Sequence, residues 1–110
     1  MKIGYYAIFD YNEYDEKEEA YGISISFPDI PECISCARSE EEGLLMAQEA
    51  LKLNTLTMQV YELPKMTPLK DINLKDNEKA FYISYNTEDI DLSEFTFYDD
   101  EGNVISLQRK

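Results

Sequence analysis

The chain of 110 residues is long enough for one domain with a single modest core, and its 44% hydrophobic content excludes a disordered chain. It contains no histidine, so catalysis would have to depend on carboxylates, tyrosine, lysine or cysteine. The formal net charge is −13, which disfavours direct binding to nucleic acid and favours a basic protein partner, although solubility alone also explains such a surface.

Three strands are predicted in the first third of the chain. Residues 2–10 carry apolar side chains on both faces, as in a strand that is covered on both sides. A charged connection follows at residues 11–19. Residues 21–27 then alternate apolar side chains with glycine and serine, which is typical of a strand with one exposed face.

Two prolines interrupt the strand pattern after residue 27. Pro28 and Pro31 each lack a backbone donor, so we expect the ladder to stop there and to resume in a short strand over residues 33–37.

A long helix is predicted to begin after Ser39. The Ser39 hydroxyl can accept a hydrogen bond from the backbone N–H of Glu42, and the Glu42 side chain can reach back to Ser39, which is a capping box. Four apolar residues recur at helical spacing and are expected to face the sheet: Leu44, Ala47, Leu51 and Met58.

Small residues beside this stripe, Gly43 and Ala50, would let the helix pack closely on the sheet. Pro64 and Pro68 are expected to end the helix and to bracket a linker that runs to about residue 79.

The last third of the chain predicts a fourth strand at residues 80–86 and a terminal hairpin. The hairpin strands are expected at residues 95–98 and 103–107, on either side of a turn that contains Gly102. The fold class is therefore α+β: a β-β-β-α-β sheet with one helix on one face, plus a C-terminal β-hairpin.

Cys33 and Cys36 have the spacing of a C-x-x-C motif, but a zinc site needs two further thiolates or imidazoles. Residues three apart in a strand point to opposite faces, so we predict neither a metal nor a disulfide there. A carboxylate–metal nuclease is a remote alternative that needs several converging acids, and only Asp10, at the end of a strand, has a suitable position. The many aromatic residues lack interleaved basic residues, which favours a core over a base-stacking surface.

Residues 3 to about 58 resemble the N-terminal domain of HicB antitoxins, the partners of small HicA toxins that cleave messenger RNA. The shared features are Tyr6-Ala7-Ile8-Phe9, Tyr21-Gly22, Phe27-Pro28-Asp29-Ile30-Pro31, Cys33 and Ser39-x-x-Glu42-x-Leu44-x-x-Ala47-x-x-Ala50-Leu51. Glu32 departs from the family, which usually has glycine there. Residues 87–110 also show no helix pair of the kind that many HicB antitoxins use to bind their operator.

The resemblance implies a single HicB-like domain over residues 1–110, with a partial RNase H-like core at 1–86 and a hairpin extension at 87–110. It implies a non-enzymatic antitoxin that neutralises a basic HicA-type toxin by occlusion and needs no cofactor. The alternative is an orphan HicB-like regulatory or structural domain that self-assembles without a toxin. The acidic residues expected to contact the partner are Asp10, Glu13, Asp15, Glu16, Asp29 and Glu32.

We also expect a two-fold homodimer, because this is the commonest closed assembly and a short sheet leaves unpaired edges. The hairpin at residues 95–107 offers Phe95, Phe97, Val104 and Ile105 to cover one edge, unless it extends its own sheet instead. No secretory leader or membrane-spanning stretch is recognised, so we expect a soluble, cytoplasmic protein.

Overall fold

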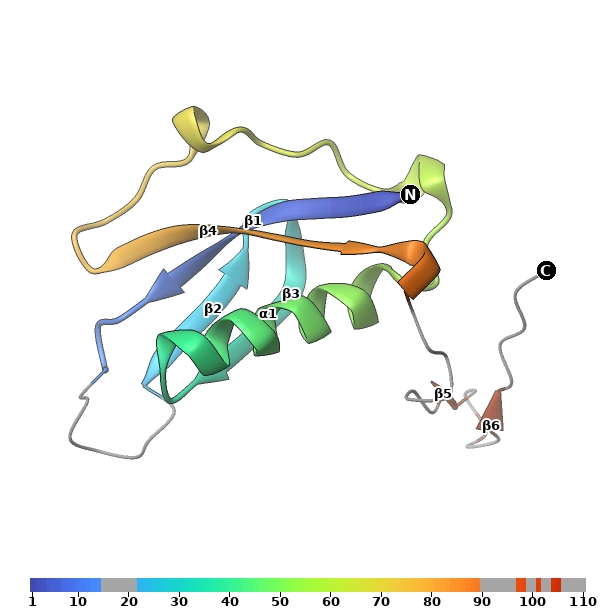
Figure 1. Cartoon of the computed structure of the whole chain (residues 1–110), viewed down its shortest axis with the longest axis horizontal. Coiled ribbons are helices and arrows are strands. Elements are labelled where there is room, and N and C mark those ends of the chain that lie inside the picture. The colour runs from blue at the N-terminus through green and yellow to red at the C-terminus, as the bar shows by residue number, and fades with distance from the viewer. Residues whose placement is uncertain (15–21, 90–96, 99–100, 102–103, 106–110) are drawn as a thin grey trace.

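A four-stranded antiparallel sheet with one helix on one face forms the main body of the protein in a computed structural model (Figure 1). The structure describes residues 1–14, 22–89, 97–98, 101 and 104–105. The main elements are β1 (Lys2–Asp10), β2 (Ile23–Phe27), β3 (Ile30–Ala37), α1 (Glu40–Thr55) and β4 (Glu78–Asn86). The strand order is β3-β2-β1-β4, so the predicted α+β architecture is confirmed.

The core lies between this sheet and α1. Alternate residues of β1, from Ile3 to Phe9, point towards the helix and are buried. The intervening residues, such as Tyr6 and Ile8, lie on the other face and are only half-buried. The prediction that both faces of this strand would be covered is therefore only partly right, because α1 covers one face. The core residues are Ile3, Tyr5, Ala7, Phe9, Ile23, Ile25, Phe27, Ile30, Cys33, Ala37, Ala47, Ala50, Leu51, Ile83 and Tyr85.

Strand β3 begins at Ile30, three residues earlier than predicted, and it includes Pro31. Its pairing with β2 is nevertheless interrupted, because Phe27 pairs with Ile30 whereas Ser26 pairs with Ile34. The prolines therefore break the register without ending the strand. An edge strand tolerates this, since a proline there need not remove a ladder hydrogen bond.

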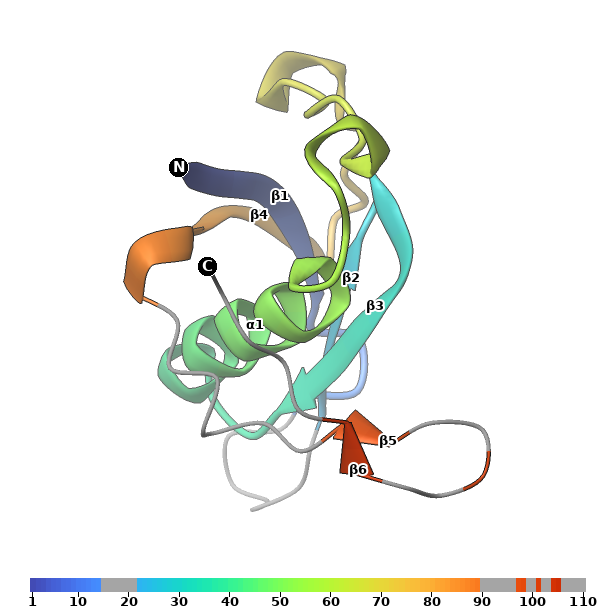
Figure 2. The same cartoon turned by 90° about the vertical axis from the view of Figure 1, so that its right-hand side faces the viewer.

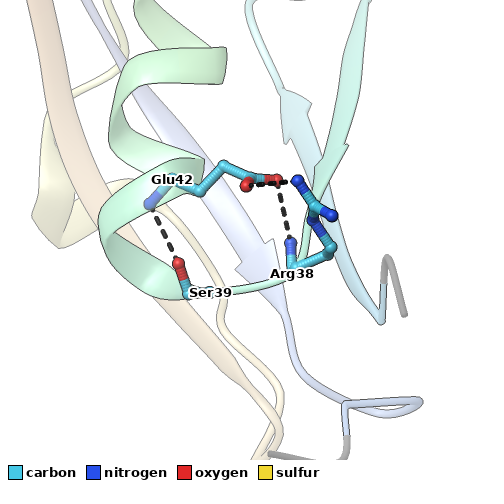
Figure 3. Close-up of polar contacts among 3 residues, drawn as sticks. All are labelled: Arg38, Ser39 and Glu42. Carbon is cyan, nitrogen blue, oxygen red and sulfur yellow. Dashed lines mark hydrogen bonds and ion pairs between the residues drawn. The ribbon is translucent and has the colours of Figure 1, made fainter. Parts of the chain in front are cut away.

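Helix α1 starts as the sequence predicts, with one difference in its cap (Figure 3). The Glu42 N–H donates to the Ser39 hydroxyl over 3.1 Å. The Glu42 carboxylate, however, accepts from the backbone N–H of Arg38 (3.2 Å) and from its guanidinium (3.3 Å), one residue beyond the expected partner Ser39. The cap therefore ties the first turn of the helix to the end of β3.

The face that α1 turns to the sheet differs from the predicted stripe. Its buried residues are Gly43, Ala47, Ala50, Leu51 and Thr55, whereas Leu44 is 39% exposed. A methyl group on Gly43 would lie 2.7 Å from Cε2 of the buried Phe9 ring, so only glycine allows this approach. The predictions for Ala47 and Leu51 are confirmed and the prediction for Leu44 is wrong. In the first turn it is Gly43 that packs on Phe9, and the adjacent Leu44 is left partly exposed.

The helix also ends earlier than predicted, at Thr55, so Met58 is not part of it. The linker to β4 contains two short 3-10 turns, η1 (Val60–Glu62) and η2 (Leu69–Asp71). The linker runs the length of the sheet, back to the start of β4 (Figure 1). The Tyr5 hydroxyl holds it near its middle by donating to the Pro64 carbonyl over 2.6 Å.

After β4 and a short turn, η3 (Thr87–Asp89), the described residues include β5 (Phe97–Tyr98) and β6 (Val104–Ile105). These two strands pair antiparallel as a separate two-stranded sheet, which confirms the terminal hairpin (Figure 2). The hairpin therefore does not extend the four-stranded sheet. No helix within the described part of the chain has the length and apolar character needed to cross a membrane.

Candidate protein-binding surface

Tyr11 anchors the start of the acidic connection between β1 and β2. Its hydroxyl donates to Oε2 of Glu40, the first residue of α1, over 2.6 Å. Nζ of Lys79 lies 3.3 Å from the same carboxylate oxygen and 5.2 Å from the centroid of the Tyr11 ring. The Tyr11 side chain therefore connects the end of β1, the start of α1 and the start of β4.

The two groups of this hydrogen bond affect each other's ionisation. Burial raises the pKa of Tyr11 well above its ordinary value, and the bond to Glu40 raises it further. The same bond, followed by the nearby Lys79 ammonium, lowers the pKa of Glu40. Tyr11 thus remains a neutral donor and Glu40 remains a charged acceptor at neutral pH.

Other carboxylates lie at the same end of the sheet. Asp10 is the strand partner of both Ser24 and Glu78. Its Oδ1 atom accepts from the backbone N–H of Asn12 (2.8 Å) and from Nδ2 of Asn77 (2.5 Å), so its position is fixed. Glu13 is exposed in the turn that follows Tyr11. We call the set Asp10, Glu13, Glu40 and Glu78 the acidic end.

Asp29 and Glu32, two further residues expected at the interface, lie at the opposite end of β2. The Asp29 carboxylate accepts from the backbone N–H of Thr67 (2.9 Å) and from the Thr67 hydroxyl (2.6 Å). Asp29 therefore fastens the linker to the β2–β3 turn. Glu32 is exposed nearby. The structure thus brings Asp10 and Glu13 together but keeps them apart from Asp29 and Glu32, while Asp15 and Glu16 lie outside the described residues.

Sequence reasoning missed two members of the acidic end. Glu40 is one of three acidic residues in the first turn of α1, where a negative charge is accounted for by the helix dipole alone. Glu78 lies before the predicted strand, which begins two residues late at residue 80. Extending the predicted strand by two residues towards the N-terminus would have included Glu78. Nothing in the sequence indicates the contact between Tyr11 and Glu40.

The two cysteines lie on opposite faces of β3, as predicted. Cys33 is buried and Cys36 is exposed, and both thiols are free. Burial raises the pKa of Cys33 to about 11, so this thiol stays protonated at neutral pH. Within the described ranges, no three acidic or cysteine side chains come together in a way that could hold a metal ion.

In the described part of the chain, one α-helix covers one face of the sheet and carboxylates gather at one end, an arrangement suited to binding another protein. Residues 6–68, more than half of the chain, match the family described as HicB_like antitoxin of bacterial toxin-antitoxin system. The chain therefore belongs to this HicB-like antitoxin family. No curated protein matches it in sequence.

A solved structure described as a toxin-antitoxin complex from Streptococcus pneumoniae contains a chain with a similar fold. The TM-score is 0.62 at 22% sequence identity, and the similarity covers 100% of this chain and 82% of the other. At this identity the similarity supports the fold.

Proposed function

We propose that this protein binds a basic HicA-type, messenger-RNA-cleaving toxin and neutralises it by covering its RNA-binding face, without catalysis of its own. Membership of the HicB-like antitoxin family supports an antitoxin role. The observation that carries the proposed mode of binding is the acidic end, in which Tyr11 fixes Glu40 while Asn12 and Asn77 fix Asp10.

Electrostatics explains how this surface would select its partner. Asp10 and Glu78 are strand partners, and Glu40 bonds to Tyr11, the residue after Asp10. Lys79 is the cation that contacts Glu40. The acidic end has more carboxylates than the one Lys79 ammonium can neutralise, and this excess negative charge attracts basic proteins over long range. Such attraction mainly speeds association, and salt weakens it because exposed charges are screened within about 8 Å at physiological ionic strength.

The acidic end and the pair Asp29 and Glu32 are expected to contribute unequally to toxin binding. Asp10 and Asp29 each accept two hydrogen bonds that fix them, so the exposed side chains beside them, Glu13 and Glu32, are the ones that can reach a partner. The acidic end holds four carboxylates, whereas Asp29 and Glu32 are two. We therefore place the main toxin contact at the acidic end and give Glu32 a minor role.

Co-expression with the protein encoded by the adjacent gene tests this function. The expected result is that the neighbour is toxic alone, is harmless with this protein present, and no longer cleaves RNA in the purified complex. If the neighbour is equally toxic in both cases, the antitoxin proposal fails and the orphan HicB-like domain takes its place.

A matched pair of charge reversals tests the surface. Glu13→Lys and Glu32→Lys make the same change in charge at exposed positions on opposite ends of β2. Glu13→Lys should slow association with the toxin by about tenfold at low salt, and Glu32→Lys should have a smaller effect. Equal effects of the two variants, measured by stopped-flow or surface-based kinetics, would contradict a localised acidic surface.

We also propose a two-fold homodimer. This self-association does not depend on a toxin, so it is compatible with both the antitoxin and the orphan domain.

A further inference from the structure

The two edges of the four-stranded sheet differ in how well they are protected. The edge strand β3 contains Pro31 and a break in register, both of which hinder the addition of another strand. The other edge strand, β4, pairs with β1 over nine consecutive residues without a shift. It contains no proline, and it has no charged residue from Ala80 to Asn86. Figure 2 shows β3 and β4 on opposite sides of the sheet.

The hydrogen bonds at the two ends of the β1–β4 ladder show which backbone groups of β4 point outward. Thr87 N–H donates to the Met1 carbonyl, and Tyr11 N–H donates to the Asn77 carbonyl, each over 2.9 Å. Hydrogen-bonded pairs alternate along an antiparallel ladder, so the odd-numbered residues of β4 bond to β1. The amides and carbonyls of Ala80, Tyr82 and Ser84 therefore face away from β1.

One of these outward groups is already covered. Nε2 of Gln48, on α1, donates to the Ser84 carbonyl over 2.9 Å. Within the described part of the chain, the backbone groups of Ala80 and Tyr82 have no such partner. The middle of β4 is therefore an open template for another strand.

A fixed aromatic side chain projects from the middle of this edge strand and lies over β1 on one face of the sheet. The Tyr82 ring rests on Gly4, where a methyl group would come within 2.1 Å of the Tyr82 hydroxyl oxygen. The Tyr6 ring packs edge-on against it at 5.4 Å, and Nζ of Lys2 lies 5.3 Å from its centroid. Tyr82 is still 45% exposed. An exposed ring held by three neighbours loses little entropy on binding and makes a good interface anchor.

We infer that a second copy of this chain pairs with β4 by two-fold, antiparallel strand addition, which joins the two sheets into one. The uncharged middle of β4 then meets its own copy, and the outward groups of Ala80 and Tyr82 find partners. Antiparallel pairing also sets the Glu78 end of one strand beside the Asn86 end of the other.

Net charge opposes this dimer, which gives it a recognisable salt dependence. Each copy carries a formal charge of −13, so the copies repel each other at low ionic strength. Salt screens this repulsion, so self-association should tighten as salt rises. Binding to a basic toxin should show the opposite trend, so the two interactions can be distinguished.

Sedimentation analysis of the full chain tests the inference, with three variants. Ala80→Pro removes one outward N–H and leaves the ladder to β1 intact. Tyr82→Lys places a charge on the β4 edge, and Ile34→Lys places the same charge on the β3 edge, at a side chain that is 70% exposed. Far-ultraviolet circular dichroism and thermal unfolding identify variants that fold like the wild type, and Tyr82→Lys decides the question if Ala80→Pro does not fold.

We expect a reversible wild-type dimer between roughly 10 µM and 1 mM that tightens with salt. Ala80→Pro and Tyr82→Lys should weaken it at least about tenfold, while Ile34→Lys should leave it unchanged. A wild-type monomer over this whole range would overturn the inference. A dimer that survives Tyr82→Lys, or one that only Ile34→Lys disrupts, would place the interface elsewhere and overturn it as well.

Discussion

Gly43→Ala tests how closely α1 packs on the sheet, because two opposing effects are of similar size. In an exposed helix this change stabilises by about 1 kcal/mol through helix propensity. Here the new methyl group would lie 2.7 Å from Cε2 and 3.3 Å from Cζ of Phe9, and 3.4 Å from Cβ of Ala37. Carbon atoms in contact prefer about 3.5–4.0 Å, so the Phe9 ring would have to move.

The Phe9 ring has little room for such a movement. It is fully buried, and its centroid lies 4.7 Å from that of Phe81. Overpacking of a dense core costs about 1–3 kcal/mol. Subtracting the gain in propensity leaves a net destabilisation of about 1 kcal/mol, which should lower the unfolding temperature by about 4–8 °C in a domain of this size. Urea unfolding, followed by circular dichroism, measures the change as a shift in midpoint.

A double-mutant cycle gives the control. In a Phe9→Leu background the ring is gone, so Gly43→Ala should no longer destabilise and should gain up to about 1 kcal/mol from helix propensity. If Gly43→Ala stabilises the wild-type protein, or if the two changes are additive, then the helix does not approach Phe9 as closely as described, and the explanation for the buried face of α1 is wrong.

Three other substitutions test separate parts of the structure. Leu51→Ala should cost about 2–5 kcal/mol in urea unfolding, because Leu51 is 0% exposed at the centre of the helix–sheet contact; a loss below about 1 kcal/mol would contradict that burial. Asp29→Ala removes both hydrogen bonds that fasten the linker, so trypsin should cleave native protein faster after Lys65, and an unchanged rate would show that other contacts hold the linker. Tyr11→Phe should raise the pKa of Glu40 towards its ordinary value of 4.5, as followed by carboxyl NMR shifts, since it removes the main cause of the lowered pKa. A pKa that is lower in the folded state stabilises the protein above the pKa of the unfolded state, so the wild type should be more stable than Tyr11→Phe above about pH 4.5 and should lose this advantage at lower pH. The difference should be under about 1 kcal/mol, because the Glu40 side chain is 44% exposed and solvent screens the interaction. A difference in stability that grows on acidification would refute the contact.

Much of the fold follows from short-range patterns in the sequence. Alternation of apolar residues identifies β1 and β2, and Ser39 with Glu42 marks the start of the helix, because strand and helix periodicity and capping depend on residues only a few positions apart. The opposite orientation of Cys33 and Cys36 follows from the same geometry of a strand. The predicted hairpin near residue 102 likewise needed only turn-forming residues between two apolar segments.

Only the tertiary structure determines which of several local possibilities is realised. The run Leu44-Leu45-Met46 offers apolar side chains on several sides of α1, so periodicity alone cannot identify the buried face. In the first turn the sheet residue Phe9 packs so close to Gly43 that a Cβ there would lie 2.7 Å from its ring, and this contact favours the side of α1 that contains Gly43.

The candidate surfaces depend on long-range pairing for the same reason. The sequence alone gives no partner for Asp29. The fold places Thr67, 38 positions away, against its carboxylate. Tyr11 meets Glu40 because β1 runs beneath the start of α1. Only the strand order shows that β3 and β4 are the two edge strands, and that Pro31 and a register break protect the β3 edge whereas the β4 edge is unprotected. Residue types and spacings determine what a segment can form, but contacts between distant segments decide which side chains and backbone groups remain available to a partner.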